Sequence, residues 1–180
     1  MEGNEHLRLF VALLLPDEAL ARLTDWQERE LPAHPGLRLV PRENLHITVA
    51  FLGRTAAERV PDIAEATRAA AEKVEPPLLE PVRYRETRSV GMIVLSDEGG
   101  RAERLASRVF KRLERLGVYE REQRRWLPHV TVVRFRERPR LQPSLPELGR
   151  VMSSEMAVML SRLAPGGARY EVLESVSLGG

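Results

Sequence analysis

The stretch NLHITVAFLG, residues 44–53, opens a run of β-branched and apolar residues with one histidine and closes it with a glycine. A short apolar run bounded by turn residues predicts a buried β-strand. Because side chains alternate along a strand, His46 and Thr48 should share one face, with the apolar residues through Phe51 packed beneath. Gly53 is expected to end the strand.

The same pattern returns in PHVTVVR, residues 128–134, where His129 and Thr131 should share a face above buried valines. Two of the four histidines are thus followed by threonine two positions on. With only six threonines in 180 residues, this coincidence has a chance of about 1%. A single histidine in an apolar strand is more often a hydrogen-bonded core residue, so the repetition is what favours chemistry. His6 and His34 lack this context and are expected at the surface.

If the two strands lie side by side, two imidazoles and two hydroxyls converge on one polar cleft. An unperturbed imidazole has a pKa near ~6.5, so one ring can be protonated while the other is neutral. Such a cleft would supply an acid, a base and hydrogen-bond donors around a small anion.

Strands and helices interleave along the rest of the chain, with hairpin-like spacings near its end. This order predicts a mixed α/β sequence with mostly antiparallel pairing. No Pro/Gly/Ser-rich linker divides it, so residues 1–180 are expected to form one domain. Further strands are expected over 7–15, 37–40, 79–84, 90–95, 156–163 and 170–178. Helices are expected over 17–31 and over 101–116. A third helix should begin at a capping box formed by Thr55 and Glu58 and continue to about Val74.

Composition narrows the possible partners. The 28 basic residues include only two lysines, against 26 acidic residues. Arginine suits phosphorylated partners, although arginine-rich codon usage would give the same bias. The chain has no cysteine, no apolar run near the roughly 20 residues of a membrane helix, and no signal-peptide pattern in residues 1–8. We therefore expect a soluble cytoplasmic protein without disulfides.

Other catalytic arrangements are harder to build from this sequence. Two histidines could bind zinc, but no third ligand is evident and cysteine is absent. No Gly-x-Ser-x-Gly elbow supports a serine nucleophile, and no Walker-type loop supports nucleotide triphosphate chemistry. Neither a metal nor another cofactor is expected.

The paired motifs resemble those of the 2H phosphoesterase superfamily, and within it the bacterial and archaeal RNA 2′,3′-cyclic phosphodiesterases, also called 2′-5′ RNA ligases. The segments RLFVA at 8–12 and ARYEVL at 168–173 are similar to that group too. The resemblance implies an α+β fold in which two intertwined lobes, each with one His-x-Thr-x motif, form two antiparallel sheets. A pseudo-twofold axis would relate the sheets, with helices outside and the cleft between the lobes.

The same resemblance implies an activity and roles for single residues. The enzyme would hydrolyse RNA 2′,3′-cyclic phosphate ends to 2′-phosphates, and the reverse use of the site would join 2′-5′ linkages without ATP. His46 would be the proton donor and His129 the proton acceptor. Thr48 and Thr131 would hydrogen-bond the phosphate oxygens. The expected partner is an RNA end, such as that of a tRNA fragment, with no membrane, no obligate protein partner and a monomeric enzyme.

Two further residues are candidates for substrate binding. Arg134 would hold the phosphate, yet it lies five residues after His129, so simple alternation turns it to the opposite face. It can reach the cleft only if the strand ends, twists or bulges there. Trp126 could stack on a base, or pack as an apolar lid residue.

Two other functions remain open from the sequence. The same two histidines could act on a small cyclic-phosphate nucleotide or an ADP-ribose cyclic phosphate. In a different class of function, the protein could hold RNA ends without turning them over.

Overall fold

The computed structural model describes residues 5–179 and confirms the predicted α+β class with antiparallel pairing. The elements in chain order are β1 (His6–Leu13), α1 (Asp17–Glu30), β2 (Leu37–Leu39), η1 (Arg42–Asn44), β3 (Ile47–Ala56), η2 (Ala57–Arg59), α2 (Val60–Ala71), β4 (Leu78–Glu86), β5 (Val90–Asp97), η3 (Glu98–Gly100), α3 (Arg101–Arg115), β6 (His129–Phe135), β7 (Val151–Met152), β8 (Glu155–Ala164) and β9 (Gly167–Ser177).

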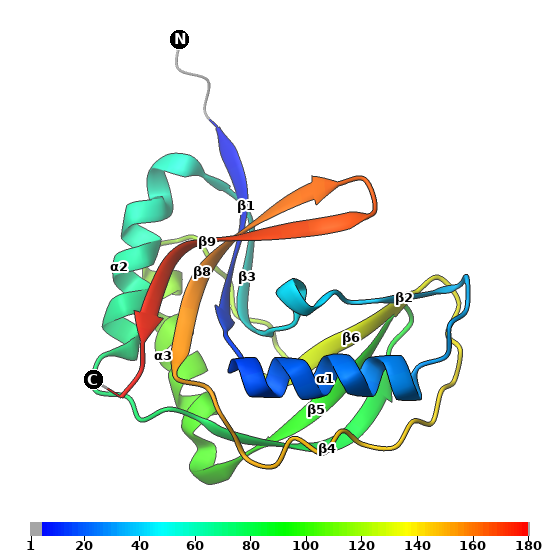
Figure 1. Ribbon diagram of the computed structural model, residues 1–180. Coiled ribbons are helices and arrows are strands. Elements are labelled where there is room, and N and C mark those ends of the chain that lie inside the picture. Colours follow the sequence, from blue (N-terminus) through cyan, green and yellow to red (C-terminus); the bar gives the residue numbers. More distant parts are fainter. Residues whose placement is uncertain (1–4, 180) are drawn as a thin grey trace.

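The strands form one continuous curled sheet, where two sheets were expected, in the order β7-β4-β5-β6-β3-β1-β8-β9, with β2 paired to β6. Figure 1 shows its two halves running at a steep angle to each other, with β3 in one half and β6 in the other. These two strands meet at a single paired position, Ile47 opposite Val130. His46 and His129 immediately precede these two residues, so the join between the halves brings the motifs together.

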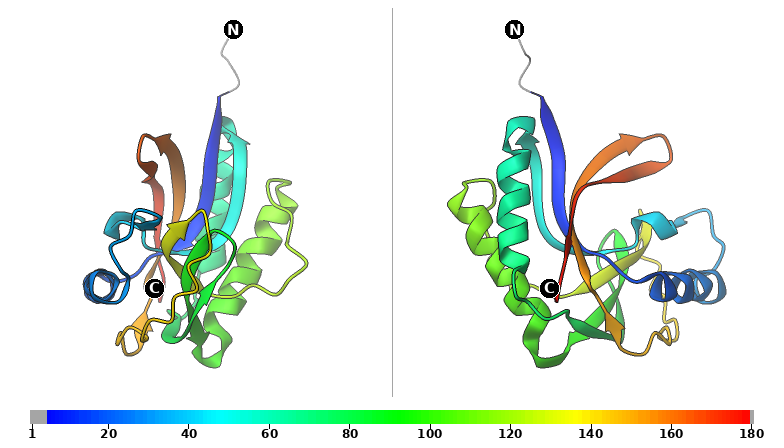
Figure 2. Two further views of the ribbon diagram at one scale, coloured as in Figure 1. Left: turned by 90° about the vertical axis from the view of Figure 1, so that its right-hand side faces the viewer. Right: turned by 60° about the vertical axis from the view of Figure 1, so that its left-hand side comes forward.

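Helices cover both sides of the sheet, as the turned views in Figure 2 show. α2 and α3 pack together on one side, where the apolar stripe of α3 buries Leu105, Val109 and Leu113. α1 lies on the other side and buries Leu23 and Trp26. No helix in residues 5–179 is both long enough and apolar enough to cross a bilayer.

Two local expectations around β3 are wrong. Gly53 does not end the strand; it sits within β3 at a positive φ of 68°, beside a register shift that accommodates it. The capping box is also absent, because β3 continues through Thr55 and α2 begins only at Val60. The Thr55 hydroxyl donates to the Gly53 carbonyl (3.4 Å) instead of capping a helix.

Candidate active site

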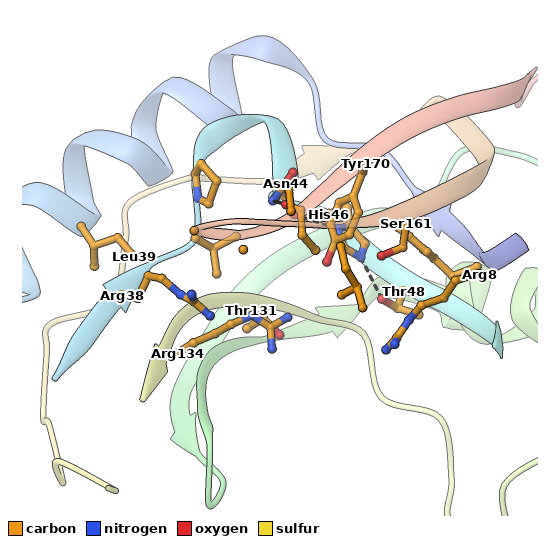
Figure 3. A pocket seen from close by; sticks show the side chains of 18 of the residues that line it. Arg8, Arg38, Leu39, Asn44, His46, Thr48, Thr131, Arg134, Ser161 and Tyr170 are labelled. Carbon is orange, nitrogen blue, oxygen red and sulfur yellow. Dashed lines mark hydrogen bonds between the residues drawn. The ribbon is translucent and has the colours of Figure 1, made fainter. Parts of the chain in front are cut away.

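Both His-x-Thr motifs line one cavity of about 600 Å³ where the two halves of the sheet meet. We call it the histidine cavity. His46 and Thr48 enter it from one half, and His129 and Thr131 from the other. The close-up in Figure 3 shows the side chains of Thr48 and Thr131 on either side of the cavity, with His46 above them. The i, i+2 spacing of each motif thus places its imidazole and hydroxyl on a common face.

Each of the two imidazoles is held by a hydrogen bond to the backbone carbonyl two residues before it. The Nδ1 of His46 lies 2.7 Å from the Asn44 carbonyl, and the Nδ1 of His129 lies 2.8 Å from the Leu127 carbonyl. A carbonyl can only accept, so Nδ1 carries the proton in each ring and Nε2 is the nitrogen left for chemistry. In neutral His46 this Nε2 accepts from the Thr48 hydroxyl (2.9 Å).

A β-bulge follows the threonine in both motifs. In β6, Thr131 pairs with Met92 and Val133 with the adjacent Gly91, so Val132 has no partner of its own. This extra residue reverses the alternation, and the fifth residue after the histidine, Arg134, lines the histidine cavity. The condition set by the sequence for Arg134 is therefore met by a bulge.

The equivalent bulge in β3 makes one core prediction wrong. Thr48 pairs with Ala12 and Ala50 with the adjacent Val11, which leaves Val49 as the extra residue. Phe51, again the fifth residue after the histidine, therefore turns to the cavity face instead of the core. Its side chain is 51% exposed, and the Arg8 guanidinium lies over its ring, 5.2 Å from the centroid.

Neighbouring groups support the β6 bulge. The carbonyl of the extra residue, Val132, accepts from the Val40 amide (3.0 Å) and from the side-chain amide of Gln27 (2.8 Å). On the other side of β6, a Cβ at Gly91 would lie 2.6 Å from the Val133 side chain and would also collide with the Tyr84 hydroxyl. A glycine is therefore required at the point where the bulge is paired.

Replacement of Gly91 by alanine should consequently disturb Arg134 as well as the fold. We expect Gly91→Ala to lower the free energy of unfolding by about 1–3 kcal/mol, the usual cost of overpacking. It should also raise KM for a phosphate ester, because the bulge directs Arg134. Urea unfolding and steady-state kinetics would measure both effects, with Ser89→Ala in the neighbouring exposed turn as the control. If Gly91→Ala were as stable as the wild type, the side chains of Val133 and Tyr84 would be able to move aside, and the requirement for glycine would be contradicted.

The surroundings of His46 lower its pKa from the ordinary value. Burial is the largest cause; the ring packs against Phe10 and Tyr170, with centroids 4.9 Å and 5.4 Å away. The hydrogen bond to the Asn44 carbonyl opposes this shift, while the positive charge of Arg134, and that of His129 when its ring is protonated, lower the His46 pKa further. A neutral His46 is therefore favoured until a negative charge enters the cavity.

Three arginines line the histidine cavity: Arg8, Arg38 and Arg134. Within residues 5–179 none of them has a carboxylate partner. Together with the two hydroxyls they make a cavity that is rich in donors to an anion. Sequence reasoning missed Arg8 and Arg38, because only strand pairing brings β1 and β2 beside the motif strands.

Three further residues of the cavity also escaped the sequence analysis: Asn44, Ser161 and Tyr170. The Asn44 side chain donates to the Ala168 carbonyl (2.8 Å), while its backbone carbonyl holds His46. Asn44 therefore ties the histidine to the β8–β9 hairpin. A serine within the apolar run 156–163 was the available signal for Ser161.

Trp126 lies outside the histidine cavity, so the structure does not support stacking on a base. Its ring packs against the hydrophobic core, and its indole nitrogen donates to the Thr48 carbonyl (3.1 Å). Trp126 thus links the segment before one motif to the strand of the other. His6 and His34 are exposed, as expected. Among residues 5–179 no group of three or more His, Cys, Asp or Glu side chains is placed to hold a metal ion.

Comparison with known proteins places this geometry in a family. The model of LigT-like phosphoesterases matches residues 13–81. The RNA 2′,3′-cyclic phosphodiesterase of Thermus thermophilus is 31% identical, over 97% of this chain and 91% of that protein. The RNA 2′,3′-cyclic phosphodiesterase of Methanocaldococcus jannaschii is 23% identical, over 93% of this chain and 99% of that protein.

Solved structures agree with this placement. The crystal structure of TT0787 from Thermus thermophilus superposes with a TM-score of 0.83 at 30% identity, covering 97% of this chain and 99% of that one. The Escherichia coli LigT structure complexed with NADP⁺ gives a TM-score of 0.79 at 26% identity, covering 98% and 99%. The chain belongs to the LigT-like family of 2H phosphoesterases.

Proposed function

We propose that this protein hydrolyses RNA 2′,3′-cyclic phosphate ends to 2′-phosphates, with His46 and His129 as general acid and general base. The observation that supports the proposal is that both motif histidines, both motif threonines and Arg134 line one cavity. The relatives named RNA 2′,3′-cyclic phosphodiesterase supply the substrate class.

The reaction is an in-line displacement at phosphorus. Neutral His129 accepts a proton at Nε2 from the attacking water as the new P–O bond forms. Protonated His46 donates its Nε2 proton to the 3′-oxygen as the P–O3′ bond breaks. Thr48, Thr131 and Arg134 hydrogen-bond the phosphoryl oxygens, where negative charge accumulates.

The lowered pKa of His46 fits this order of events. In the free enzyme, the buried ring next to Arg134 favours the neutral form. A bound phosphate diester brings a negative charge that offsets those cations and raises the His46 pKa. Substrate binding thus favours the protonated form of His46, which donates the proton to the leaving 3′-oxygen.

The same site would also support ligation without ATP. A 5′-hydroxyl in place of water would attack phosphorus, and the 3′-oxygen would again leave. The bond made would be a 2′-5′ linkage, and the broken cyclic ester replaces ATP as the source of free energy. Phe51 and Arg8 at the edge of the cavity would offer an aromatic face and a cation to the terminal nucleotide.

A single incubation tests the activity. The substrate is a DNA oligonucleotide ending in one ribonucleotide 2′,3′-cyclic phosphate, which contaminating ribonucleases cannot cleave internally. We expect a 2′-phosphate product in the presence of EDTA, and no product from a His46→Ala/His129→Ala double variant purified in the same way. A 3′-phosphate would reverse the leaving oxygen, loss of activity in EDTA would indicate a metal, and unchanged substrate would indicate a binding protein.

A further inference from the structure

A second hollow, of about 860 Å³, adjoins the histidine cavity. The two share Arg38 and Arg134 in their walls. We call this space the second hollow; Arg136 and Arg138 line it as well, together with His34 and Glu137. A ligand held in the histidine cavity can therefore continue past the shared arginines into the second hollow without leaving the surface.

Three arginines of these walls come from β2, from β6 and from the bend that follows β6. Arg38 is directly opposite Arg134 in the antiparallel register. Arg136 lies one residue beyond the end of β6, in a bend, and it lines the second hollow together with Arg38 and Arg134. The side chains of Arg134 and Arg136 are exposed. Figure 3 shows Arg38 and Arg134 near one another at one end of the histidine cavity.

This cluster is electrostatically uncompensated. Like charges directly opposite each other destabilise a strand pair. Among the described residues, Arg38, Arg134 and Arg136 have no ion pair with a carboxylate, and Glu137 lies beyond ion-pair distance from all three. Arg138 at the rim differs, because the buried Glu86 carboxylate pairs with it at 3.2 Å. Three neighbouring cations without partners favour a ligand that carries several negative charges.

We propose that the second hollow binds the RNA chain adjoining the cyclic phosphate, with Arg38 and Arg136 as ligands of its backbone phosphates. The inference rests on the proposed function, because the histidine cavity must hold the terminal phosphate. It goes further by defining the preferred substrate as an oligonucleotide rather than a mononucleotide. A nucleic acid fits the observations because its phosphates are joined in a chain, as the two spaces are joined through Arg38 and Arg134.

The test compares two substrates and four proteins. The substrates are cytidine 2′,3′-cyclic phosphate and a DNA hexanucleotide that ends in the same cyclic ribonucleotide. The proteins are the wild type, Arg136→Ala, Arg136→Glu and the control Arg115→Ala. Arg115 is also exposed, and it is the last residue of α3, which lies far from β2 in Figure 1. Arg136 lies outside the histidine cavity.

We expect the wild type to prefer the hexanucleotide. Arg136→Ala should lower kcat/KM on the hexanucleotide by about tenfold, as for a lost charged hydrogen bond, with a larger loss in Arg136→Glu. The mononucleotide rate should stay unchanged in both variants, and Arg115→Ala should match the wild type on both substrates. Binding of the 2′-phosphorylated hexanucleotide should lose about 0.7 from its log–log salt slope in Arg136→Ala.

Two outcomes would overturn the inference while leaving the proposed function intact. One is equal use of both substrates by the wild type, with no effect of Arg136→Glu on either. The other is an equal loss on both substrates in Arg136→Ala, which would mark a structural role. Failure of the wild type to turn over either substrate would instead reject the proposed function, and the inference with it.

Discussion

Alanine in place of His129 should lower kcat/KM on an RNA 2′,3′-cyclic phosphate by about 10²–10⁴-fold, the usual contribution of a positioned acid or base. The reason is specific to one nitrogen. The Nδ1–H of His129 is engaged by the Leu127 carbonyl (2.8 Å), and its Nε2 has no hydrogen-bond partner within residues 5–179. Without this Nε2, the water that attacks phosphorus has no positioned base.

Alanine in place of His46 should cost a similar factor for the opposite reason, since the 3′-oxygen would leave without a proton. The double variant should lose little more than either single variant, because acid and base act as a unit. Steady-state kinetics with thermal unfolding would check this, with His6→Ala as the control outside the cavity. Near wild-type activity in both single variants, with the fold intact, would end the two-histidine proposal.

Alanine in place of Arg134 should change both the rate and the pH profile. Loss of a donor to the phosphoryl oxygens should lower kcat/KM by about 10²–10³-fold. The Arg134 charge also lowers the His46 pKa, so its removal raises that pKa. Because His46 must be protonated to act as the acid, the alkaline limb of kcat/KM should move to higher pH.

Lysine at the same position separates these two effects. Arg134→Lys keeps the positive charge and so should leave the alkaline limb close to that of the wild type. It loses the planar fork of donors, so the rate should recover only in part. An alkaline limb that stays in place in Arg134→Ala would contradict the role of His46 as proton donor.

The sequence predicted those features that depend on local periodicity. The i, i+2 spacing placed His46 beside Thr48, and His129 beside Thr131, because a regular strand needs no information from its neighbours. The stripe of α3 predicted its buried face in the same way. Gly117 follows the end of α3; its amide donates to the Glu114 carbonyl (2.9 Å), and its φ is 71°.

Features that depend on strand pairing were beyond the sequence. A bulge is defined by the register of two strands, so nothing within PHVTVVR itself shows that Val132 lacks a partner. Phe51 was wrongly predicted to lie in the core for the same reason, because the bulge at Val49 depends on the register of β3 with β1. Arg38 and Arg134 are opposite each other although 96 positions (134 minus 38) separate them in the chain. Such contacts follow from the topology of the sheet rather than from any local pattern.

The paired bulges have a consequence for how a substrate is oriented. The same backbone device in the two halves presents a guanidinium at Arg134 but an aromatic ring at Phe51. If the two bulges presented the same type of side chain, the two ends of the cavity would offer the same contacts to a bound nucleotide. We expect the unlike pair to impose one direction on it, with the phosphate toward the cation and the base toward the ring. That choice of direction would determine which ester oxygen meets which imidazole, and hence which isomer is released.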